Sequence, residues 1–135
     1  MATQRDPDPL APWFGRLTDR LGEASWQPAA DVFETDRAIV VRLELAGVAG
    51  TDVSVTIDGD VLRIRGVRKP RVDAAAERLH QMEIASGPFE RAIRIGVAFE
   101  RDRVTAALEE GLLRVVLPKR SAGPRRIGVE KRDEP

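Results

Sequence analysis

Residues 104–118 read VTAALEEGLLRVVLP, and this stretch decides the fold. Val104, Ala106 and Leu108 alternate with polar or small residues, so they share one face of a strand. Glu110-Gly111 follows as a turn signal, because glycine adopts a positive φ angle without steric cost, and a second apolar segment comes after it. The stretch therefore predicts a β-hairpin within an antiparallel sheet.

The chain before this hairpin repeats the same period of two. Four segments have apolar faces formed by Ile39, Val41, Leu43 and Leu45, by Val53, Val55 and Ile57, by Leu62 and Ile64, and by Phe89, Ile93 and Ile95. Short strands of this kind, with turn signals about every 8–15 residues, are typical of an antiparallel sandwich. The sequence predicts an all-β, immunoglobulin-like fold.

The composition excludes several classes of protein. The 135 residues are enough for one domain with tails, and there is no cysteine to form a disulfide framework. The 22 basic and 22 acidic residues cancel, so the net charge gives no reason to expect binding to nucleic acid or to a membrane surface. No run approaches the roughly 18 apolar residues of a membrane span, and the first residues lack a secretory signal. We therefore expect a cytoplasmic protein.

The composition also divides the chain into an N-terminal arm (1–28), a β-rich domain (29–118) and an extended, polar C-terminal segment (119–135). Large apolar residues in the arm lie at helical spacing, which predicts a partly helical arm. The candidate residues of the arm are Trp13, Phe14, Leu17, Leu21 and Trp26. They either pack on their own domain or form an apolar surface for other chains.

Four motifs occur in the order and spacing of a known family. They are A-x-x-x-x-G-x-L at Ala106, Gly111 and Leu113, G-x-F-x-R at residues 87–91, DVFETD at residues 31–36, and I-x-V at residues 127–129. Together they make the chain resemble the small heat-shock proteins of the Hsp20 or α-crystallin domain family, of the bacterial type. The resemblance covers roughly residues 28–129.

The resemblance implies an ATP-independent holdase chaperone without cofactors. Such a protein binds partly unfolded client proteins under stress, works as a dynamic homo-oligomer built from dimers, and passes its clients to ATP-dependent chaperones. A second hypothesis is a non-enzymatic adaptor on a sandwich like that of p23-related co-chaperones. A third is an enzyme, but the single histidine, His80, has no metal-ligating neighbours, and the sequence contains no nucleophile or phosphate-loop motif.

The resemblance also assigns a role to the C-terminal segment. Ile127 and Val129 would dock into a groove on a neighbouring subunit, or they are stray apolar residues of an ordinary flexible terminus. The predicted groove lies between two rows of side chains, formed by Val53, Val55 and Ile57 and by Val104, Ala106 and Leu108. The basic residues around the motif are best explained as a solvated tail, because acidic residues follow and no aromatic residue is interleaved.

A dimer interface is implied in the same way. Residues 79–84 resemble the strand that bacterial and plant family members exchange between subunits, the alternative being a local edge strand. Arg91, on the apolar face beside Phe89, would join an ionic network at that interface, or it is a plain arginine at a sheet edge. The predicted interface residues are Leu79, His80, Gln81, Met82 and Arg91.

Overall fold

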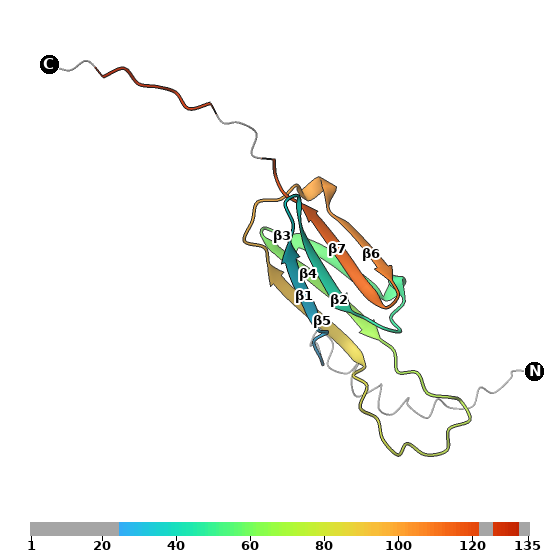
Figure 1. The fold of residues 1–135 in the computed structure, drawn as a ribbon. Helices are drawn as coiled ribbons and strands as arrows, with labels where there is room; N and C mark the ends of the chain where they lie inside the picture. Colours follow the sequence, from blue (N-terminus) through green and yellow to red (C-terminus); the bar gives the residue numbers. More distant parts are fainter. Residues whose placement is uncertain (1–24, 122–125, 133–135) are drawn as a thin grey trace, which may run out of the picture.

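The computed structural model describes residues 25–121 and 126–132, and its strands form two antiparallel sheets (Figure 1). One sheet has the order β1-β2-β7-β6 and the other has the order β3-β4-β5. The elements are β1 (Ala30–Glu34), β2 (Ala38–Glu44), η1 (Gly50–Asp52), β3 (Val53–Asp58), β4 (Val61–Arg68), β5 (Gly87–Arg94), η2 (Arg101–Arg103), β6 (Thr105–Glu109) and β7 (Leu112–Pro118). The prediction of an all-β antiparallel sandwich is confirmed. In the described part of the chain, no helix has the length and apolar character needed to cross a membrane.

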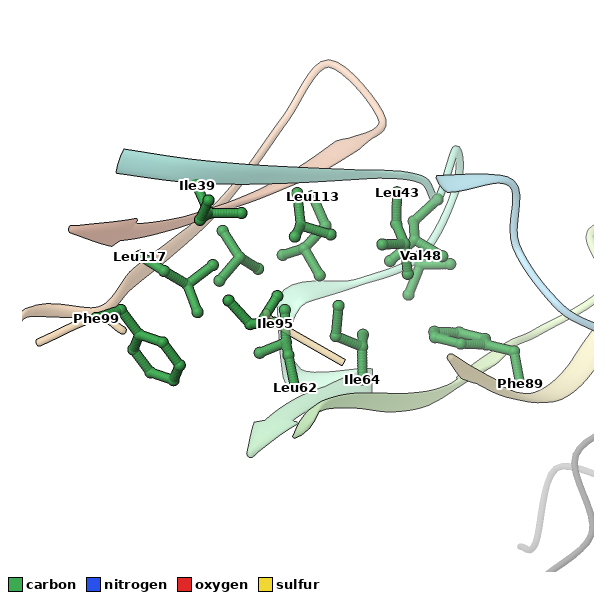
Figure 2. Close-up of a cluster of buried hydrophobic side chains, with 13 residues drawn as sticks. Ile39, Leu43, Val48, Leu62, Ile64, Phe89, Ile95, Phe99, Leu113 and Leu117 are labelled. Carbon is green, nitrogen blue, oxygen red and sulfur yellow. The ribbon is translucent and has the colours of Figure 1, made fainter. Parts of the chain in front are cut away.

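The core lies between the sheets and is built from the alternating residues of the strands (Figure 2). Leu43 of β2 and Leu62 of β4 are completely buried, and β7 contributes Leu113, Val115 and Leu117. Since successive side chains of a strand point to opposite faces, the period of two in the sequence carries over directly into burial. The apolar faces predicted for residues 39–45 and 62–64 are confirmed.

The hairpin predicted over residues 104–118 has the geometry that its turn residues predict. Glu109 pairs with Leu112, so the loop consists of Glu110 and Gly111 alone. Their φ angles are 51° and 77°, the double positive φ of a type I′ turn. This turn matches the twist of the flanking strands and fixes their register.

The sandwich leaves three strand edges open. Among the described residues, β1, β3 and β6 each pair with a neighbour on one side only. The edge of β5 is partly covered, because the backbone N–H of Ser25 donates to the carbonyl of Pro88 at 2.9 Å and Trp26 forms a bridge with Phe89. Open edges present unpaired backbone groups, so they are sites where another chain can add a strand.

Gly66 in β4 marks the closest approach within the sandwich. A Cβ atom added there would overlap the carbonyl oxygen of Asp52 and lie 2.5 Å from Cζ of Phe89. Phe89 is only 2% exposed, so its ring has no room to retreat. The missing side chain of Gly66 thus allows the Phe89 ring to approach β4 closely.

Residues 69–86 form a long loop between β4 and β5. The loop contains a turn in which Asp73 accepts bonds from the backbone N–H groups of Ala75 and Ala76. No strand occurs in it, so the alternative of a local edge strand over residues 79–84 is not found in the single chain, and the exchanged strand stays a prediction. The segment pairs with none of the strand edges of its own chain, and its apolar side chains, including Met82 and Ile84, are exposed.

Candidate functional site

Two rows of half-buried apolar side chains lie on the open edges of β3 and β6. Val53, Val55 and Ile57 come from β3, and all three pack against the core. From the other sheet, Val104 and Leu108 pack against the same core, whereas Ala106 between them is exposed. The structure thus places these residues on the core-facing side of two edge strands, where small Ala106 leaves the row incomplete.

The C-terminal motif does not use these rows in its own chain. Ile127 is 81% exposed and Val129 is 94% exposed. Both residues belong to an extended segment that lies away from the sandwich (Figure 1). The sequence therefore carries two apolar side chains with no cover among the described residues.

A third apolar feature lies at the open edge of β1. Val32 faces the interior of the sandwich, opposite Val41. It is nevertheless 50% exposed, because no described strand pairs with β1 on its other side.

At the edge of the other sheet, Arg91 of β5 lies opposite Ile64 on the core-facing side and is half-buried. It forms no ion pair with any described residue, although a charge removed from water needs a partner.

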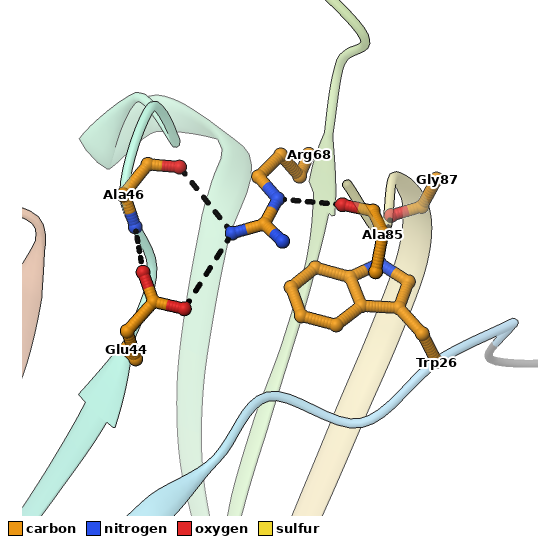
Figure 3. A network of polar contacts seen from close by, with 6 residues as sticks. All are labelled: Trp26, Glu44, Ala46, Arg68, Ala85 and Gly87. Carbon is orange, nitrogen blue, oxygen red and sulfur yellow. Dashed lines mark hydrogen bonds and ion pairs between the residues drawn. The ribbon is translucent and has the colours of Figure 1, made fainter. Parts of the chain in front are cut away.

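Trp26 follows the first of the two alternatives given for the arm residues, because it packs on its own domain. Its indole packs edge-on against the Phe89 ring at a centroid distance of 5.4 Å. Nε1 of the indole donates to the carbonyl of Gly87 at 3.0 Å, and Figure 3 shows these two residues side by side. Trp26 is thus held by its own domain and is not a free surface for other chains. The other arm residues, Trp13, Phe14, Leu17 and Leu21, lie outside the described residues.

An ionic cluster lies on the outer face of the three-stranded sheet. Glu90 of β5 stands opposite Arg65 of β4, and its carboxylate pairs with Arg63 and with Nε of Arg65, the latter at 3.2 Å. The hydrogen bond from Arg63 holds the pKa of Glu90 below its ordinary value, against the opposing effect of partial burial, and the bond from Arg65 adds to the lowering.

The charge of Glu90 is expected to stabilise the fold only above its unfolded pKa. A group whose folded pKa is lowered contributes stability that is present above the unfolded value, near 4.5, and is lost as the pH falls through the folded value. At pH 7, Glu90→Gln should lower the free energy of unfolding by less than about 1 kcal/mol, since the cluster is partly solvated. Thermal unfolding from pH 7 to pH 3 should show this difference shrinking toward zero, while Glu109→Gln on β6 serves as a control without an ion pair among the described residues.

Comparison with known proteins gives these features a family. The model of the Hsp20/alpha crystallin family matches residues 31–130. The chain belongs to this family. It is 36% identical to Spore protein SP21 of Stigmatella aurantiaca over 127 residues, which cover 92% of this chain and 73% of the relative. It is 29% identical to Small heat shock protein C2 of Rickettsia felis over 99 residues, covering 73% of this chain and 64% of the relative.

Solved structures of the family share the fold. A small heat-shock protein from Xylella fastidiosa aligns with a TM-score of 0.68 at 32% identity, over 80% of this chain and the whole of that one. The hspA of Xanthomonas axonopodis aligns with a TM-score of 0.65, also at 32% identity, over 72% of this chain and 97% of that one. Membership of the family identifies a chaperone with a role in stress, and a non-enzymatic one.

The Hsp20 hairpin signature has a physical basis in this chain. Gly111 supplies the positive φ of the turn, and its carbonyl accepts a 2.7 Å bond from the backbone N–H of Leu45. A Cβ atom at Gly111 would come within 3.1 Å of Cα of Ala46. Leu113 is buried in the core, and Ala106 lies in the incomplete row on β6. Glycine at the turn is thus required by conformation and by space.

One departure from the Hsp20 pattern also has a consequence. The family usually has L-P-G where this chain has Leu45-Ala46-Gly47. The backbone N–H of Ala46 donates to Oε1 of Glu44 at 3.0 Å, a bond that proline cannot form. Sequence reasoning missed this contact, and it missed Arg68, toward which the other oxygen of Glu44 points.

Within residues 25–121 and 126–132, no group of three or more histidine, cysteine or acidic side chains is placed to hold a metal ion. His80 lies exposed in the loop between β4 and β5.

Proposed function

We propose that this chain is an ATP-independent holdase that works as a homo-oligomer built from dimers. The observation that carries the proposal is the exposed apolar surface outside a complete core. The tail carries Ile127 and Val129, the loop carries Met82 and Ile84, and three strand edges are open. A monomeric soluble protein rarely leaves so much apolar surface uncovered, and family membership supports its use in assembly.

In the proposed assembly, the tail of one subunit docks on another. Ile127 and Val129 would insert between the row on β3 and the row on β6, beside the space left by Ala106. The linker from Arg120 to Arg126 has seven residues, and extended chain of that length spans up to about 23–25 Å. Each contact is small enough to open and close, while several contacts in one oligomer act together.

The proposed dimer forms through the loop between β4 and β5. Residues 79–84 have no strand partner in their own chain, and β1 has an open edge beside half-exposed Val32. Adding residues 79–84 of one subunit to the β1 edge of the other would give the segment a strand partner and would pair the free backbone groups of β1. It would also bring partner carboxylates within reach of Arg91, whose guanidinium has no ion pair among the described residues.

Client binding then follows by mass action. A partly unfolded protein exposes apolar segments, which replace subunit contacts on the arm and on the strand edges. Bound segments cannot pair with one another, so the step that leads to aggregation is blocked. Downstream ATP-dependent chaperones would receive the clients.

Light scattering of a heat-stressed client tests the proposal. In the absence of nucleotide, a stoichiometric amount of this protein should suppress aggregation almost completely, and serine at Trp13, Phe14, Leu17 and Leu21 together should remove most of the protection. The fourfold variant leaves Trp26 in place, so its β-sheet spectrum and unfolding temperature should match those of the original chain. A chain that assembles normally but gives no protection would favour an adaptor role on the same sandwich.

A further inference from the structure

Arg68 occupies the neck of the long loop between β4 and β5. It is the last residue of β4 and stands opposite Gly87, the first residue of β5, so residues 69–86 leave and return at this pair. Its side chain is only 11% exposed, an unusual degree of burial for an arginine at the end of a strand. The guanidinium of Arg68 is therefore held by protein groups more than by water.

The guanidinium of Arg68 touches three separate segments of the chain (Figure 3). Nε donates to the carbonyl of Ala85 at 2.8 Å, at the returning end of the loop. Nη1 lies 3.9 Å from Oε2 of Glu44, the last residue of β2, and 3.4 Å from the carbonyl of Ala46, just after that strand. Cζ lies 4.1 Å from the centroid of the Trp26 ring, at the start of the described chain. We call these contacts the Arg68 clasp.

Each side of the clasp is itself fixed. Trp26 is held by its bond to Gly87 and by the Phe89 ring, so its indole presents a face to the cation. Glu44 is oriented by the backbone N–H of Ala46. The loop, in contrast, packs loosely, since a hollow of about 510 Å³ lies between it and the chain that follows β2.

We propose that Arg68 is a positioning residue that couples the attachment of the N-terminal segment to the base of the loop between β4 and β5. When Trp26 leaves its place, the guanidinium loses its stacking partner and its bond to Ala85 weakens, so the loop is released. The inference deepens the proposed function, because the arm would meet clients and the loop would form the dimer. The clasp joins these two surfaces through one side chain.

Arginine is suited to this task and lysine is not. The planar guanidinium stacks on the indole while its edge donates to two carbonyl groups in different directions. A lysine keeps the charge but has no planar surface and no Nε–H at the position that reaches Ala85. Arg68→Lys therefore removes the coupling while it retains the ion pair with Glu44.

Limited trypsin digestion of the full chain measures the coupling. Arg78 lies exposed in the loop, and Arg103 in η2 gives an internal reference for general unfolding. Arg68→Lys should raise the rate of cleavage after Arg78, relative to Arg103, about five- to tenfold through local opening. Trp26→Phe, a change outside the loop, should raise the same ratio, and the double variant should cleave no faster than the faster single variant, since both act through one unit.

Two further variants sharpen the test. Ala46→Pro removes the N–H that orients Glu44, and it should raise the same cleavage ratio about twofold. Arg94→Met, at the opposite end of the pair formed by β4 and β5, should leave the ratio unchanged.

Tryptophan fluorescence gives a second measurement. In a Trp13→Phe background, Trp26 is the sole tryptophan, and Arg68→Lys should increase the quenching of its fluorescence by acrylamide.

Independent effects of Arg68→Lys and Trp26→Phe, multiplying in the double variant, would overturn the coupling. So would an unchanged cleavage ratio in Trp26→Phe. Native mass and client protection of the original chain separate this inference from the proposed function. A chain that assembles and protects clients while the two effects multiply refutes the clasp alone, and a monomeric chain with intact coupling refutes the proposed assembly alone.

Discussion

Replacing both Ile127 and Val129 by alanine is expected to reduce the assembly to dimers. The two substitutions remove five carbon atoms from each docked tail, or roughly 4 kcal/mol at about 0.8 kcal/mol for each buried carbon. That is close to a thousandfold in the affinity of one tail. Static light scattering at micromolar protein should show the mass of a dimer, because the proposed exchange of residues 79–84 does not involve the tail.

A matched control lies within the same segment. Arg126 and Glu130 flank the motif and are exposed, so alanine at both changes the tail without touching its apolar side chains. This control should keep the mass of the original oligomer. An oligomer of full mass in the Ile127→Ala, Val129→Ala variant would contradict the docking of the tail.

Replacing Gly66 by alanine is expected to destabilise the sandwich strongly, because an added methyl group has no space at this position. The new Cβ would meet the backbone of η1 on one side and the Phe89 ring on the other. Asp52 lies in a turn that is fixed by a hydrogen bond from its backbone N–H to the carbonyl of Ala49. The Phe89 ring is held in place by Trp26. We expect a loss of about 3 kcal/mol, at the upper end of what overpacking costs, and a fall in the unfolding temperature of roughly 15 °C.

Gly96→Ala provides the comparison. Gly96 lies in the connection after β5, where an added Cβ would meet nothing within 4 Å and φ is not positive. Its replacement should leave stability unchanged or raise it slightly, because alanine restricts the unfolded chain. Calorimetry of the two variants therefore compares the same chemical change in crowded and open space. Equal unfolding temperatures would show that the approach of Phe89 to β4 is not tight.

The strands could be predicted from the sequence because their signal is local. Alternation places Ile39, Val41 and Leu43 on one face whatever the rest of the chain does, and Glu110-Gly111 fixes the turn without distant help. The order of motifs then led to the family, although the sheet order itself, with β2 beside β7, joins segments far apart in the chain.

What the sequence could not predict concerns residues whose environment is made by distant segments. Trp26 was grouped with the arm by composition, yet Phe89 and Arg68 lie more than forty positions away and give no sign in the local sequence. Residues 79–84 have the composition of a strand, but they pair with none of the strand edges of their own chain, so local composition alone could not place them. The need for glycine at position 66 likewise depends on Phe89 and Asp52, which approach it from other segments of the chain.

The pairing of β2 with β7 has a consequence for synthesis. Leu43 pairs with Leu113, so the central strand of the larger sheet has no neighbour on that side until almost the whole domain has emerged from the ribosome. During that interval, the nascent chain exposes the apolar face of β2 to its surroundings. If the proposed holdase activity holds, the protein passes during its own synthesis through the same exposure of apolar surface that it covers on its clients.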